Sequence, residues 1–136
     1  MVKVKVSGNA IQVLDVMSDK LENLRPMLGR NAAYQERSTK LNFAQQSDPD
    51  GAPWAALRPS TLLRKRSGAI LRETSALINS VSSEVSGDSA FVFATQGYGI
   101  FHQTGTSKMA QRKFLGFGDR DREEHAKIAK EFLSTI

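Results

Sequence analysis

The stretch "SDPDGAPWAAL", residues 47–57, holds two of the four prolines and the only tryptophan of the chain. Its Asp-Pro-Asp-Gly part predicts a tight turn, because proline fixes φ and glycine tolerates positive φ. The next residue, Ala52, precedes a second proline and is therefore held extended. The tryptophan follows with little backbone freedom. The stretch thus contains a candidate structural anchor motif: Pro49, Asp50, Gly51, Pro53 and Trp54.

The side chain of a tryptophan whose backbone is restricted in this way can point into the core or toward a partner. Pointing inward, Trp54 is a plug that joins a helical first half of the chain to a second half that contains a sheet. Pointing outward, it is a docking knob for a neighbouring molecule. The plug is the favoured interpretation, because tryptophan is highly buried on average in folded proteins.

The chain before the anchor motif is predicted to be mostly helical. Val2, Val4 and Val6 alternate with lysines, a period of two that is typical of a half-buried strand with a protected edge. From residue 10 onward the apolar side chains recur every three or four residues, which predicts a helix. Pro26 is expected to bend or break this helix near Asn23, and helical composition resumes until about residue 46.

The chain after the anchor motif mixes helix and strand patterns. A short basic helix is expected behind Ser60, a second helix over residues 71–81, and a helical turn within 98–105. The pair Gly87-Asp88 predicts a hairpin between strands at 81–85 and 90–94. The second strand is apolar at nearly every position, so we expect it inside the sheet with both faces covered.

The last part of the chain is predicted to be one strand and one helix. Residues 112–118 have the pattern of a short final strand. Asp121 and Glu124 form a capping-box pair at the start of a C-terminal amphipathic helix, whose acidic first turn suits the helix dipole.

Length and composition limit the possible classes. At 136 residues the chain is expected to form one domain, 1–136, that buries about two-thirds of its unfolded surface. The absence of cysteine excludes disulfides and thiolate chemistry. No stretch approaches the ~20 apolar residues of a membrane span, and the N-terminus lacks a signal-peptide core. A soluble protein without a membrane partner is therefore expected.

The net charge of +5 is unevenly distributed. No acidic residue lies between Asp50 and Glu73, whereas five basic residues do: Arg58, Arg64, Lys65, Arg66 and Arg72. A run of this kind is most often a solvated face, but it can also contact phosphate or an acidic protein surface. The candidate patch facing a partner or DNA consists of Arg58, Arg64, Lys65 and Arg66.

The chain has no recognisable catalytic, metal or cofactor site. Nucleophilic catalysis needs a base beside the nucleophile, and neither His102 nor His125 lies in such a motif. We expect His102 to be structural and His125 to lie at the surface of the last helix. "DPDG" lacks the later ligands of a calcium loop, and "GYGIFHQTG" lacks the ending of a phosphate-binding loop. The residues support no enzyme class and no cofactor.

Five motifs in order resemble the phage virion morphogenesis family, the Mu-like and related tail-completion proteins of long-tailed phages. They are "FAQQSDPDGAPWAAL", "STLLRK", "ILRETSALINSV", "YGIFHQTGT" and "RKFLGFGDRD". The resemblance covers roughly residues 40–135. The residues that match the family pattern are Phe43, Pro49, Asp50, Gly51, Pro53, Trp54, Leu71, Thr74, Leu77, Tyr98, His102, Gln103, Gly105, Arg112, Phe114, Leu115 and Gly116. The departures, at Ser75, Gly99 and Gln111, concern small residues and local turns.

The resemblance implies an α+β fold in which a small antiparallel sheet of about four strands is flanked by helices. These include the kinked N-terminal helix and the C-terminal amphipathic helix. It also implies a non-enzymatic virion protein that completes the tail or neck and enables head–tail joining. The expected working state is a ring, with six copies as the expected number. Expected partners are the tail terminator or tail tube, the head connector or adaptor, and passing genomic DNA. The expected locations are the virion neck and, during assembly, the host cytoplasm.

A second class stays open. The basic run over residues 58–72 also suits a nucleic-acid-binding module. The chain shows neither a helix-turn-helix signature nor the aromatic and basic interleaving of single-strand binders. A basic surface is also expected near a DNA conduit, so the two interpretations overlap.

Overall fold

The structure, a computed structural model, describes three ranges of the chain: 10–63, 70–71 and 75–134. These residues form six helices and two strands: α1 (Ala10–Glu22), α2 (Arg25–Gln45), α3 (Pro59–Leu62), α4 (Ala76–Ser80), β1 (Val81–Ser86), β2 (Ser89–Ala94), α5 (Gly99–Thr104) and α6 (Asp119–Ser134). The α+β class is confirmed.

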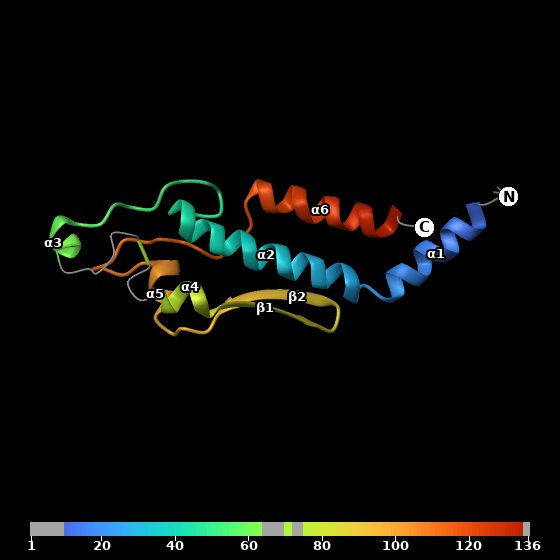
Figure 1. Cartoon of the computed structure of the whole chain (residues 1–136), viewed down its shortest axis with the longest axis horizontal. Coiled ribbons are helices and arrows are strands. Elements are labelled where there is room, and N and C mark those ends of the chain that lie inside the picture. Colours follow the sequence, from blue (N-terminus) through green and yellow to red (C-terminus); the bar gives the residue numbers. More distant parts are fainter. Residues whose placement is uncertain (1–9, 64–69, 72–74, 135–136) are drawn as a thin grey trace.

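The long helix α2 is the centre of an elongated molecule (Figure 1). The β1–β2 hairpin packs along one side of α2, and α6 packs along another. The short helices α3, α4 and α5 gather at one end, whereas α1 projects beyond the body at the opposite end (Figure 1). Segments that are far apart in the sequence therefore meet along α2.

The break between the first two helices lies where the sequence predicts it. Helix α1 ends at Glu22, and Pro26 occupies the first turn of α2, where its missing amide hydrogen leaves no helical bond unmade. Helix α2 is closed by Gln46, whose φ of 52° is left-handed and whose amide donates to the carbonyls of Asn42 and Phe43. The predicted kink and the predicted end near residue 46 are confirmed.

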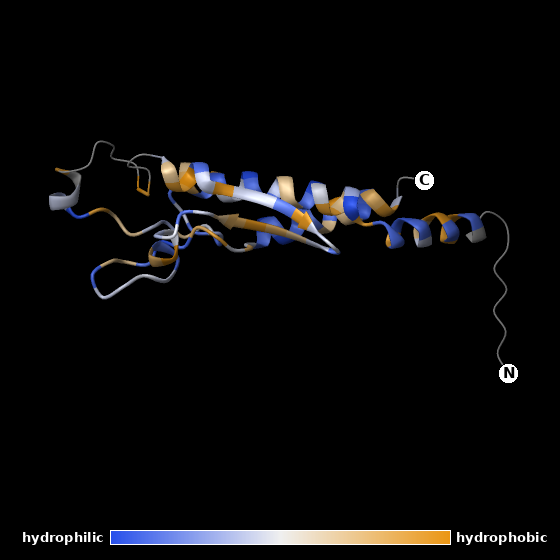
Figure 2. Ribbon diagram, turned by 90° about the horizontal axis from the view of Figure 1, so that it is seen from below, coloured by the Kyte–Doolittle hydropathy of each residue, from blue (hydrophilic) through white to orange (hydrophobic). Residues whose placement is uncertain are grey.

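The predicted hairpin is present. β1 and β2 pair antiparallel from Val81 opposite Ala94 to Ser86 opposite Ser89, and Gly87 in the turn has a φ of 60°. Figure 2 shows β2 as the more apolar strand and β1 as the more polar one. However, β2 has a strand partner on one edge alone among the described residues, and Phe91 is 49% exposed. The expectation of an interior strand covered on both faces is wrong.

The described residues therefore contain a sheet of two strands and not the expected four. The predicted strand at Val2–Val6 lies outside the described residues. The predicted strand at 112–118 has no regular secondary structure, although its composition is that of a strand. Its backbone groups bond to side chains from helices and loops, and so no neighbouring strand is needed to satisfy them.

The hydrophobic core lies where the C-terminal half of α2 meets the hairpin and the region around residue 114. Its buried members come from α2, the loop after α2, the adjoining α4 and β1, and the segment before α6: Phe43, Trp54, Leu77, Val81 and Phe114. The C-terminal helix is amphipathic as predicted, with Ile128 buried, but it begins three residues early, at Asp119, with Gly118 in place of Asp121 at the cap. Asp121 is therefore the third residue of α6 and not its cap.

Candidate functional site: the anchor turn and the polar seam

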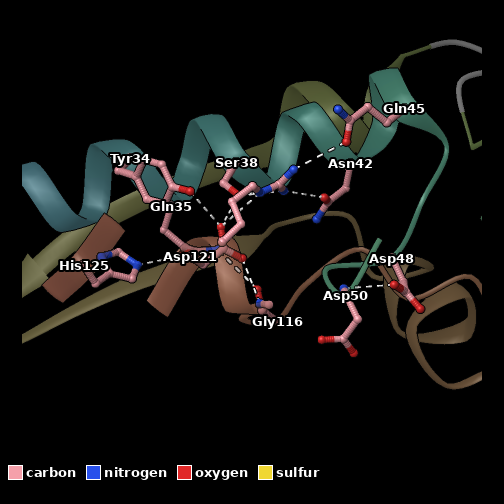
Figure 3. Close-up of polar contacts among 12 residues, drawn as sticks. Tyr34, Gln35, Ser38, Asn42, Gln45, Asp48, Asp50, Gly116, Asp121 and His125 are labelled. Carbon is pink, nitrogen blue, oxygen red and sulfur yellow. Dashed lines mark hydrogen bonds and ion pairs between the residues drawn. The ribbon is translucent and has the colours of Figure 1, made fainter. Parts of the chain in front are cut away.

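Residues 47–54, here called the anchor turn, form a closed loop after α2. The Gly51 amide donates to the Asp48 carbonyl at 3.0 Å, which closes a four-residue turn with Pro49 in its second position. Gly51 has a φ of 93°, a conformation that favours glycine. The Asp48 carboxylate accepts the amides of Asp50 and Ala52, each at 2.9 Å (the first is drawn in Figure 3). The predicted turn is present.

The anchor turn directs Trp54 into the core. Its amide donates to the Gln46 carbonyl at 2.8 Å, so the tryptophan directly follows a closed loop. The side chain is 6% exposed and meets the Phe43 ring edge to face, with centroids 5.5 Å apart. Its indole Nε1 donates to the Lys113 carbonyl at 2.8 Å. This position agrees with the plug and joins the end of α2 to the segment before α6.

Four consecutive carbonyls, of residues 113–116, each accept a hydrogen bond from a side chain. The donors are Trp54 Nε1 to Lys113, Asn42 Nδ2 to Phe114, Gln103 Nε2 to Leu115 and Gln35 Nε2 to Gly116, at 2.8, 3.1, 2.7 and 3.2 Å. Buried carbonyls need such partners whether or not a strand is nearby. Residues 113–116 are thus fixed by α2, the anchor turn and α5 in place of a sheet.

Gln103 in α5 is the most connected of these donors. Its side-chain oxygen accepts the amides of Phe114 and Leu115 at 3.1 and 3.0 Å, while its nitrogen donates to the Leu115 carbonyl. The Arg112 amide donates to the carbonyl of the adjacent His102 at 2.8 Å. In the "HQ" pair of the fourth motif, the Gln103 side chain and the His102 backbone carbonyl therefore hold residues 112–115 in place. Both contacts are structural.

The anchor turn also contacts the start of α6 directly. A side-chain carbon placed on Gly118 would overlap the carbonyl oxygen of Pro49, and one placed on Gly116 would lie 3.2 Å from the Pro49 ring. Only glycine allows the two backbones to approach so closely at residue 118. The "GFG" of the last motif and the "PDG" of the first are therefore two sides of one contact.

A row of polar side chains, here called the polar seam, lies between α2 and α6 (Figure 3). Its members are Tyr34, Gln35, Ser38, Asn42, Arg120, Asp121 and His125. At its centre Asp121 is fully buried and accepts hydrogen bonds from Ser38 Oγ, from Tyr34 Oη at 3.0 Å and from the Gly118 amide at 2.9 Å. The last of these is half of a capping box, with Gly118 at the cap.

The Asp121 carboxyl is kept ionised by its neighbours. Burial alone raises its pKa, but hydrogen bonds from Ser38, the Gly118 amide and Tyr34, with the nearby Arg120 charge, outweigh burial and lower the pKa below its ordinary value of 3.8. Burial, together with the hydrogen bond to Asp121, raises the pKa of the Tyr34 hydroxyl. Asp121 therefore acts as a fixed acceptor that docks α6 on α2.

Arg120 extends the polar seam toward the anchor turn. Its guanidinium donates to Ser38 Oγ and Asn42 Oδ1, both at 3.0 Å, and reaches Gln45 Oε1 at 3.4 Å (Figure 3). Asn42 in turn holds the Phe114 carbonyl, so one chain of contacts runs from α6 through α2 to the core. A buried network that is satisfied in this way fixes one arrangement of its elements.

His125 belongs to this seam and is half-buried, so the expected placement at the surface of the last helix holds only in part. Its Nε2 lies 2.8 Å from Gln35 Oε1 and its Nδ1 lies 3.1 Å from Asn31 Oδ1. Tyr34 and Phe117 contact the ring edge to face. Burial lowers the pKa of the imidazole below 6.5, against the opposing effect of Asp121 and Glu124. All four neighbours are remote in sequence or in a loop, and so no local pattern identifies this role.

The predicted basic patch falls mostly on residues that the structure does not describe. Arg64, Lys65 and Arg66 lie outside the described residues, and Arg58 is exposed at the start of α3. Arg58 lines an open groove of about 440 Å³ with two further cations, Lys108 and Arg112. Arg112 donates to the carbonyls of Ala55 and Ala56, at 2.9 and 3.2 Å. Sequence spacing alone does not bring these three cations together.

Two other kinds of site are absent from the described residues. Across residues 10–63, 70–71 and 75–134, no group of three or more His, Asp or Glu residues is arranged to hold a metal ion. None of the described helices has the length and apolar character needed to cross a bilayer. The geometry around the anchor turn and the polar seam instead serves docking of chain segments, through hydrogen bonds that are already paired within the molecule.

One of three comparisons with known proteins gives a match. No curated protein and no solved structure matches the chain. The model of one family, the phage virion morphogenesis family, matches residues 7–134, which is nearly the whole chain. The matched range includes the anchor turn, the 113–116 segment and the polar seam. The chain therefore belongs to the phage virion morphogenesis family.

Proposed function

We propose that this chain is a non-enzymatic structural subunit that completes the tail or neck of a tailed bacteriophage or prophage and so enables head–tail joining. The observation that carries this proposal is the family match over residues 7–134. The fold supports it, because the motif residues are used to fix loops to helices. A subunit that must bear contacts with several neighbours benefits from surface loops held rigidly by buried hydrogen bonds.

The proposed working state is a closed ring, with six copies as the expected number. Head-to-tail contacts between identical subunits generate rings when the rotation closes. The end that carries the short helices supports partner contacts, because α5 exposes Ile100 and Phe101 beside Tyr98, with exposed fractions of 62%, 51% and 42%. Grouped apolar side chains of this kind mark interaction surfaces. The proposed neighbours are the tail terminator or tail tube and the head connector.

The test is a phage or prophage that lacks the gene. We expect heads and tails to accumulate unjoined, or tails to be defective, while DNA replication proceeds normally, as seen by electron microscopy and by measurement of replicated DNA. Normal joined particles, or a defect confined to replication or transcription, would contradict the proposal. Mass spectrometry of wild-type virions gives an independent check, because the proposal requires copies of this chain in the particle.

A basic nucleic-acid-binding module is the second candidate. It is favoured by the three cations, Arg58, Lys108 and Arg112, that share one groove. The purified protein would then bind duplex DNA with an affinity that falls steeply with salt, because each neutralised phosphate releases counterions. Charge reversal at the groove cations Arg58 and Lys108, together with Arg64, Lys65 and Arg66, distinguishes the candidates. For an assembly subunit the variant should fold and impair particle completion without altering DNA binding by the purified chain.

A further inference from the structure

The free edge of β2 is bordered by a groove with a mainly apolar surface. The groove has a volume of about 310 Å³ and is lined by the first half of β2, by Leu28 and Ala32 of α2, and by Phe117, with Asn31, Gln35 and His125 of the neighbouring helices as polar members. No residue of β1 lines it, so it lies on the side of β2 that faces away from the hairpin partner. A second hollow of about 270 Å³ continues past Ala94 and is bounded on its far side by Leu115.

The grooves lie in the position that a further strand beside β2 would occupy. On one side is the strand edge, with backbone groups that have no strand partner among the described residues. On the other side are Leu115 and Phe117, and the floor is α2. An unpaired apolar edge of this kind is a template for pairing with another strand. Phe91 and Phe117, 49% and 54% exposed, are the apolar rim that such a strand would cover.

The sequence contains one unassigned segment with the matching pattern. Val2, Val4 and Val6 place three β-branched side chains on one face, and the lysines between them fall on the other. In β2, Val92 packs on the core, so Phe91 faces outward, as does Glu84, its partner on β1. A strand with valines over α2 would set its lysines on the outward face beside the Phe91 ring, a favourable neighbour for a cation.

The same chain is poorly placed to supply this segment to its own groove. Helix α1 projects away from the hairpin, and its N-terminal end lies farthest from the hairpin (Figures 1 and 2). Thirteen helical residues span about 20 Å at 1.5 Å each. Nine extended residues span about 30 Å, so returning along α1 uses about six of them and leaves too few to pair with β2.

We propose that residues 2–6 of a second copy of this chain pair as a strand with the free edge of β2. The contact joins two different surfaces, the N-terminal segment of one copy and the groove of the next. It is therefore a head-to-tail contact, which can close into a ring. This inference rests on the proposed function for its biological setting, because it names the contact that links neighbouring subunits. The contact forms between purified copies and needs no other virion protein.

The absence of cysteine makes disulfide trapping a direct test. One population of the full chain carries Lys3→Cys or Lys5→Cys, and a second population, with a different mass tag, carries Phe91→Cys or Phe93→Cys. Adjacent strands lie about 4.8 Å apart, and a disulfide requires Cα atoms within about 7 Å. The matched control is Glu84→Cys, which lies opposite Phe91 but one strand farther, about 10 Å from the added strand.

We expect mild oxidation of the mixed populations to give a crosslinked pair that contains both tags for at least one combination, and little product with Glu84→Cys. Equal crosslinking of the Glu84→Cys control would overturn the proposal, since the partner would then lie at β1 or associate at random. A chain with both Lys5→Cys and Phe91→Cys that forms only an internal bond would also overturn it, because the pairing would be within one copy. The proposal would likewise be overturned if no disulfide formed between the two populations at the highest soluble protein concentration.

Two results separate this inference from the proposed function. Loss of head–tail joining on gene deletion, together with no crosslink, leaves the function standing and removes the strand exchange. Crosslinked copies, together with normal particles from the deletion, would leave the strand exchange standing and remove the proposed function. A chain lacking residues 2–6 gives a further check: it should retain its circular dichroism spectrum and lose self-association in sedimentation.

Discussion

Truncation of the anchored tryptophan, Trp54→Ala, should be among the most destabilising single changes in this protein. Large-to-small replacement of a buried aromatic costs about 3–5 kcal/mol of unfolding free energy. Two contacts in the structure account for part of this free energy. The hydrogen bond from Nε1 to the Lys113 carbonyl accounts for about 0.5–1.5 kcal/mol, and the edge-to-face contact with Phe43 for a similar amount. Lost burial and the remaining cavity supply the rest.

A matched variant separates the ring from its polar atom. Trp54→Phe keeps an aromatic ring against Phe43 but leaves the Lys113 carbonyl without its donor, so we expect a smaller loss of about 1–2 kcal/mol. Urea denaturation followed by far-UV circular dichroism measures both losses. Tryptophan fluorescence is unsuitable, because Trp54 is the only tryptophan of the chain. An unchanged slope with denaturant would show that the variants unfold from a comparably compact state.

A small loss of stability in Trp54→Ala would contradict this prediction. A Trp54→Ala protein that is within about 1 kcal/mol of wild type, with the same denaturant slope, would mean that the core does not depend on the indole. If that variant also failed to support particle completion, Trp54 would act at an interface, as a docking knob, and the plug would be wrong. Equal losses for Trp54→Ala and Trp54→Phe would instead place most of the effect in the hydrogen bond.

The remaining predictions concern backbone contact, the amide bridge and pH. Gly118→Ala should cost about 1–3 kcal/mol because its methyl group overlaps the turn carbonyl, whereas Gly29→Ala, at an open helical site, should stabilise by about 0.5–1 kcal/mol; thermal melts compare them. Gln103→Ala should cost about 2–3 kcal/mol in urea denaturation, because it leaves one carbonyl and two amides without partners. Unfolding free energy should decline as pH falls from about 6.5, since burial lowers the pKa of folded His125, and His125→Gln should remove this decline. A second decline should begin below about pH 3.8 and be absent in Asp121→Asn, because burial, which raises the pKa of Asp121, is outweighed by hydrogen bonds that lower it in the folded state.

The elements that the sequence predicts well are those with local causes. Pro26 lacks an amide hydrogen, and so the break before α2 can be placed within a few residues. Gly87 tolerates the positive φ of the hairpin turn, and Gly51 does the same in the anchor turn. In each case one residue type restricts its own backbone, and the tertiary structure does not override that restriction.

The errors arise where distant residues decide the outcome. Residues 112–118 have the composition of a strand, but their carbonyls are met by side chains such as Asn42 and Gln103, which no local pattern links to them. His125 lies among charged residues in α6, yet Gln35 and Asn31 enclose it from a helix some 90 positions earlier. The prediction of about four strands is wrong for the same reason, because it assumes that every segment with a strand-like composition pairs with another such segment.

The site could be predicted in part. The family resemblance identifies the residues of the anchor turn, and the preference of tryptophan for burial indicates where Trp54 points. The polar seam is missing from that prediction, since Ser38 and Asp121 are common surface residue types and become a buried pair only when α6 docks on α2. A fully buried aspartate at the third position of a helix has no distinctive sequence signal.

The direct contact between Pro49 and Gly118 has a consequence for how the protein is made. Nearly seventy residues separate the two sides of that contact, and the bonds from Ser38 to Asp121 and from Arg30 to Glu131 close still longer loops. Contacts between residues so distant form late and slow the folding of a chain. While it is still emerging from the ribosome, the nascent subunit has α2 without the helix that covers its polar side. Folding can finish only after the last helix is released, so a prematurely terminated product lacks the surface that α2 and α6 form together.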